Sequence, residues 1–137
     1  MKTYTEKELR ELEAWIAEHV MGYEERQCYN GSQRIEGQTF WVCKGRQVVA
    51  PSFNGKHRFP PFATDPAAAM QVLEKCAEML RKDCNSVEIL RNTTGWAVCS
   101  LYRDGFGHEE HDTVEAETLP LAICLFARKL FGEITNT

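Results

Sequence analysis

The fold is decided by residues 121–127, which read LAICLFA. Seven apolar residues in a row cover almost every side of a helix, and such a helix must be buried on more than one face. Thr118 suits its start, Pro120 is tolerated in its first turn, and Gly132 suits its end. The pattern predicts a helix at the centre of the domain or at a subunit interface. The residues expected at such an interface are Leu121, Cys124, Leu125 and Phe126.

Two amphipathic helices are predicted upstream of this segment. The first covers 6–21, where Thr5 and Glu8 have the spacing of a capping box and apolar residues then recur at helical intervals. The second covers 66–82, with Asp65 as its N-cap and a proline at its first helical position. The three helices are separated by segments with a different periodicity.

Extended segments are predicted at 39–43, 47–50, 86–91 and 96–103, with a short fifth strand at 113–116. The first two flank a Lys-Gly-Arg connection that suits a hairpin. The order is therefore α-β-β-α-β-β-(β)-α. This order predicts an α+β fold with three helices and one small antiparallel sheet of four to five strands.

The composition is that of an ordinary globular protein. The chain has 137 residues, 43% of them hydrophobic and 26% charged, and we expect residues 1–137 to form one domain. The net charge is −4, so binding to duplex nucleic acid is not expected, and only a local basic patch would favour contact with phosphates. No apolar run approaches the length of a membrane span, and the charged N-terminus is unlike a signal peptide. We therefore expect a location in the cytosol.

The six cysteines are expected to be thiols in that compartment. Cys43, Cys76, Cys99 and Cys124 fall at apolar positions of predicted helices or strands, where cysteine behaves as a small hydrophobic residue. No C-x-x-C pair occurs, so neither a structural zinc nor a redox site is expected. We expect no cofactor.

Three segments resemble a known family. They are 62–75 and 116–124, which open the second and third helices, and 20–23 near the N-terminus. Together they resemble the phage ABA sandwich domain, a family of small bacteriophage and prophage proteins, although the typical member has tryptophan where this chain has Tyr23. The resemblance implies an α/β/α sandwich, with helices on both faces of the sheet, and a phage origin. It carries no catalytic residues over to this chain.

A basic run among phenylalanines is the leading candidate for a binding site. Lys56, His57 and Arg58 lie within a proline-rich segment at 51–63 that is predicted to be a loop. Cations bind phosphate and aromatic faces stack on bases. The alternative is a loop that buries its phenylalanines in the core and leaves its charges in water. The residues expected to bind a nucleotide are Lys56, His57, Arg58, Arg103, Trp41 and Phe59.

A second candidate is the run at residues 108–112, HEEHD. His108 and His111 stand beside carboxylates and could hold a metal ion on a helical turn. The run follows Asp104-Gly105 and is predicted instead to be a solvated loop, so no metal site is expected.

Two functions follow from these observations. The first is a phage accessory protein that binds, and so sequesters, a nucleotide-type signal of host defence, or that caps a host protein. The second is a non-catalytic protein–protein interaction or structural module that assembles as a homo-oligomer through its C-terminal helix. An enzyme that uses His111 or Cys84 is not expected, because the sequence shows no nucleophile paired with a base.

Overall fold

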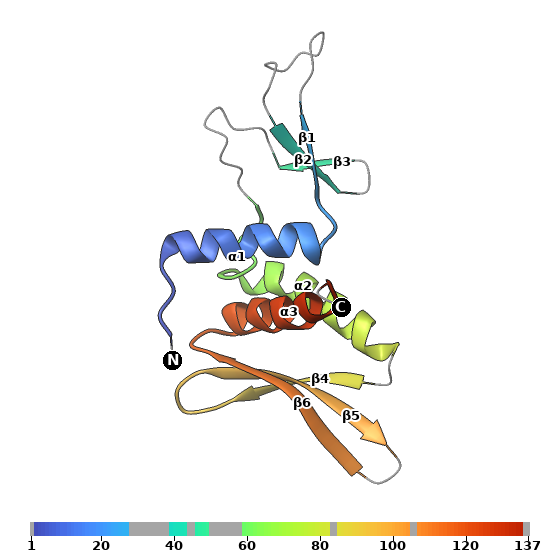
Figure 1. The fold of residues 1–137 in the computed structure, drawn as a ribbon. Helices are drawn as coiled ribbons and strands as arrows, with labels where there is room; N and C mark the ends of the chain where they lie inside the picture. Colours follow the sequence, from blue (N-terminus) through green and yellow to red (C-terminus); the bar gives the residue numbers. More distant parts are fainter. Residues whose placement is uncertain are drawn as a thin grey trace.

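The computed structural model describes residues 2–27, 39–43, 46–49, 59–82, 85–104 and 107–135. The described residues form three helices and six strands (Figure 1). The helices are α1 (Glu6–His19), α2 (Pro66–Arg81) and α3 (Leu119–Thr135). The strands are β1 (Glu24–Gln27), β2 (Thr39–Cys43), β3 (Arg46–Val49), β4 (Asn85–Arg91), β5 (Trp96–Asp104) and β6 (Gly107–Ala116). The fold class is α+β, as predicted.

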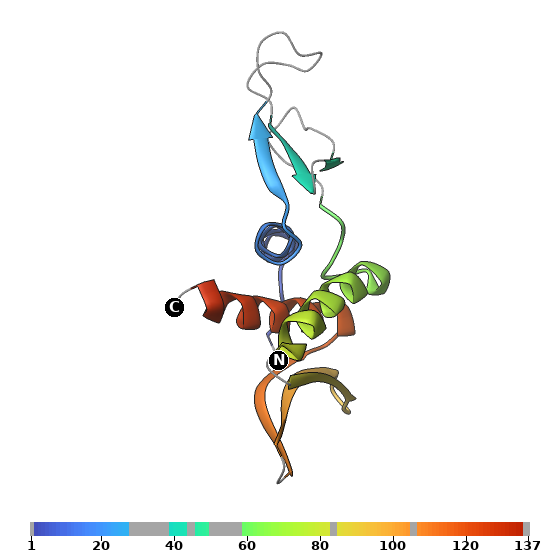
Figure 2. The same cartoon turned by 90° about the vertical axis from the view of Figure 1, so that its right-hand side faces the viewer.

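The strands form two antiparallel sheets rather than one. The first has the order β1-β2-β3 and the second the order β4-β5-β6. Helices α2 and α3 lie side by side between α1 and the β4–β6 sheet, whereas the β1–β3 sheet extends beyond α1 (Figures 1 and 2). Local sequence patterns predict strands well, but they do not say which strands pair.

The helices cover one face of the β4–β6 sheet, so the predicted arrangement with helices on both faces is wrong for this sheet. Its two faces differ in burial, as two adjacent pairs of residues show. Ile89 pairs with Val98, which is fully buried against the helices, and Leu90 pairs with Ala97 but is 47% exposed. The apolar surface of α3 is nevertheless buried on more than one side, because α3 lies between α1 and the β4–β6 sheet.

Helix α3 forms the centre of the core. All seven residues of the 121–127 run are buried, and they pack with residues of α1 and α2. Phe126 and Phe62 are the largest fully buried side chains. The central position, one of the two alternatives for this helix, is therefore the one that the chain adopts. Within the described ranges, no helix is long and apolar enough to span a membrane.

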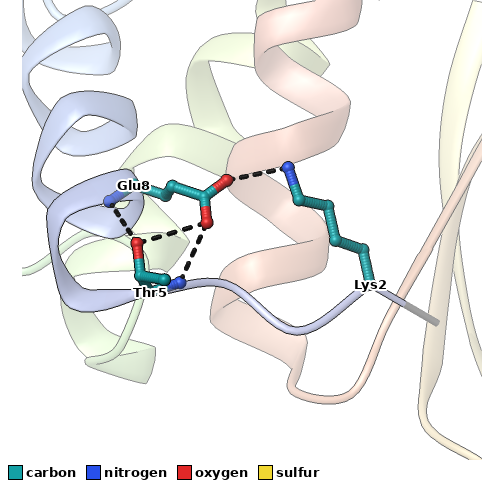
Figure 3. A network of polar contacts seen from close by, with 3 residues as sticks. All are labelled: Lys2, Thr5 and Glu8. Atoms are coloured by element: carbon teal, nitrogen blue, oxygen red, sulfur yellow. Dashed lines mark hydrogen bonds and ion pairs between the residues drawn. The ribbon is translucent and has the colours of Figure 1, made fainter.

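The start of α1 confirms the predicted capping box (Figure 3). The Glu8 N–H donates to the Thr5 hydroxyl at 3.2 Å, and the Thr5 N–H donates to the Glu8 carboxylate at 3.2 Å. Lys2 lies 2.7 Å from the same carboxylate. Hydrogen bonding to Lys2 and to the Thr5 backbone lowers the pKa of Glu8, and the same ion pair raises the pKa of Lys2.

The turn between β4 and β5 requires a glycine. The Asn92 side chain accepts hydrogen bonds from the backbone N–H groups of Thr94 and Gly95. A Cβ atom at Gly95 would collide with the backbone carbonyl of Ala116 at the end of β6. Only glycine allows the turn and the end of the sheet to approach this closely.

Three element boundaries differ from the predictions. Strand β1 lies outside the segments predicted to be extended, because its residues EERQ have no apolar alternation. Strand β6 begins at Gly107, so the predicted loop at 108–112 is wrong, and these residues pair with β5 instead. Helix α3 continues past Gly132, which packs beside Trp15 of α1, so the predicted end at this glycine is wrong.

Candidate functional site

Tyr23 and Phe59, which flank the 24–58 stretch in the sequence, meet at the helical core. The Tyr23 N–H donates to the carbonyl of Ala17 at 2.8 Å. The ring of Phe59 packs against the ring of Tyr23, with centroids 6.3 Å apart. Both rings also contact the core. The 24–58 stretch, called the excursion below, is thus flanked by two residues that an aromatic contact joins.

A buried carboxylate anchors the segment that follows this excursion. Glu13 is 1% exposed, and its Oε2 accepts a hydrogen bond from the Ala63 N–H at 3.2 Å. Its Oε1 pairs with the guanidinium of Arg10. A buried charge must be paired and hydrogen-bonded to be tolerated. Glu13 therefore fixes residues just before α2 to the side of α1.

Sequence reasoning missed Glu13, although a signal was present. It stands four residues after Leu9 and three before Ile16, so it lies on the apolar face of α1. A charged residue in the middle of an apolar stripe indicates a buried ion pair, and Arg10 is at the right spacing to form it.

The β1–β3 sheet carries two aromatic residues on its middle strand. Phe40 is paired with Arg26 of β1, and Trp41 is paired with Glu25 of β1 and Val49 of β3. The last pair of the β2–β3 ladder joins Cys43 to Arg46. The two aromatic residues of β2 therefore stand at register positions opposite one basic and one acidic residue of β1.

The predicted ligand residues are brought together only in part. Trp41 lies on β2 and Phe59 closes the stem of the same excursion. Arg103 lies on β5, on the other side of the helices (Figure 1). Lys56, His57 and Arg58 lie outside the described residues. A site that combines Arg103 with Trp41 is therefore not formed within one chain.

The proline-rich segment at 51–63 was predicted to be a loop that either binds a ligand or buries its phenylalanines in the core. Residues 59–63 adopt neither helix nor strand, as expected. Phe62 is fully buried in the core, as the structural alternative required, and Phe59 is partly buried. The part at 51–58, with the basic run, lies outside the described residues.

The four residues predicted at a subunit interface are taken up by the core of the single chain. Leu121 and Leu125 are each 8% exposed, and Cys124 and Phe126 are fully buried. These four side chains therefore expose little surface that a partner could contact.

The described thiols are unsuited to nucleophilic chemistry. Cys76, Cys99 and Cys124 are buried and unpaired by disulfides, which confirms that they serve as small hydrophobic residues. Burial raises the pKa of Cys76 to about 12 and raises that of Cys124 still further, with the Glu13 carboxylate adding to the second effect. A thiol with such a pKa is protonated at neutral pH, and the thiolate is the reactive form.

The metal candidate at His108 and His111 lies on strand β6 instead of a helical turn or loop. Among the side chains that the structure describes, no three metal-ligating residues gather in one place. The imidazoles themselves are not among those side chains.

Comparison with known proteins identifies the fold. No family model and no curated protein matches the chain. The chain is similar in structure to a phage protein from Bacillus cereus ATCC 14579, with a TM-score of 0.50 and 21% sequence identity. The match covers 94% of this chain and 91% of that chain. Likeness at this identity concerns the fold, and membership of the phage ABA sandwich family stays a prediction.

Proposed function

We propose that the chain is a phage-encoded accessory protein that acts in the host cytoplasm by binding a partner, without catalysing a reaction. One observation supports a role without catalysis. Among the described buried groups, Glu13 anchors the segment before α2, and burial raises the pKa of the Cys76 and Cys124 thiols well above neutral pH. The fold likeness to a phage protein supports the origin.

The leading ligand is a nucleotide-type signal used in host defence, which the protein would sequester. The basic run at Lys56, His57 and Arg58 provides phosphate-binding cations in the sequence, and Trp41 of β2 and Phe59, next to the run, are aromatic residues of the kind that stack on bases. Arg103 is dropped from this set because β5 lies across the helices from β2.

Thermal denaturation with a panel of cyclic and ADP-ribose-type nucleotides tests this ligand class. A ligand at about 100 times its dissociation constant should stabilise the protein by about 2.7 kcal/mol. The Lys56→Glu/Arg58→Glu variant should lose the shift in melting temperature. The matched Arg81→Glu/Lys82→Glu variant, which changes two exposed cations at the C-terminal end of α2, should keep it. The absence of a shift with every nucleotide would contradict sequestration.

A second function, a protein–protein interaction module, is favoured by the uncovered face of the β4–β6 sheet. Leu90 on this face is one of the exposed large hydrophobic residues, at 47%. Light scattering of the wild type and of a Leu90→Glu variant tests whether copies of the chain assemble there. An assembly that the variant abolishes supports this function, and a wild type that scatters as a monomer contradicts self-assembly.

A further inference from the structure

We draw no further inference here: the strongest candidate, the face of the β4–β6 sheet around Leu90 that the helices leave uncovered, belongs to the second function already proposed, and nothing in the described part of the chain shows what covers it.

Discussion

The helical core and the β1–β3 sheet are built on different principles. In the core, α3 is buried on nearly every side, between α1 on one side and the β4–β6 sheet on the other. The β1–β3 sheet is formed by strands of four or five residues, and Tyr23 and Phe59, which flank this part of the sequence, contact each other at the core. The contrast indicates that stability resides in the helical core.

The largest expected effect compares one phenylalanine from each region. Phe126→Ala removes a fully buried ring from α3 and should lower the free energy of unfolding by about 3–5 kcal/mol. If stability resides in the helical core, Phe40→Ala, on β2, should change it by less than about 1 kcal/mol. Urea denaturation followed by circular dichroism of the helices measures both. Similar losses in the two variants would remove the distinction between the regions.

A smaller effect on stability is expected at Glu13, which holds the segment before α2 to the side of α1. Arg10→Ala removes the guanidinium that pairs with the buried Glu13 carboxylate, which keeps its hydrogen bond from the Ala63 N–H, and should destabilise the protein by about 1–3 kcal/mol. Lys7→Ala removes an exposed cation from the same helix and should change stability by no more than about 0.5 kcal/mol. Equal effects of these two variants in urea denaturation would show that the buried carboxylate does not depend on its pair.

The smallest effect concerns the pH dependence of the capping box. The pKa of Glu8 is lowered in the folded protein. Its contribution to the stability of the fold is therefore present above the ordinary pKa of 4.5 and is lost as the pH falls through the lowered pKa. Glu8→Gln keeps an acceptor for the Thr5 N–H but removes the charge. The fall in melting temperature between about pH 7 and about pH 3 should therefore be smaller in Glu8→Gln than in the wild type. In the Glu11→Gln variant, which changes an exposed glutamate of the same helix, the melting temperature should fall by as much as in the wild type.

Much of the fold could be predicted where the chemistry is local. The starts of α1 and α2 follow from Thr5, Glu8 and Asp65, which satisfy backbone N–H groups within one turn. Burial of α3 follows from a run of seven apolar residues that no exposed helix tolerates. These signals do not depend on distant parts of the chain.

The features that sequence reasoning missed depend on tertiary contacts. Strand β1 exists because β2 supplies its hydrogen-bond partners, and its own residues carry no strand pattern. Strand β6 extends back to Gly107 through charged residues because an edge strand tolerates them. Gly132 does not end α3, because packing against Trp15 of α1 outweighs the weak helix propensity of glycine. The division into two sheets likewise follows from which strands meet.

The candidate site could be predicted only as a set of residue types. The basic run and Trp41 belong to one excursion of the chain, but the sequence alone gave no reason to separate Arg103 from them. That separation depends on the helices that lie between β2 and β5.

Hydrogen exchange of the whole protein tests the division between the helical core and the β1–β3 sheet most directly. The amides of α3 and β5 should exchange only through global unfolding, and those of β1–β3 should exchange faster through local opening. Uniform protection of all strands would contradict this division.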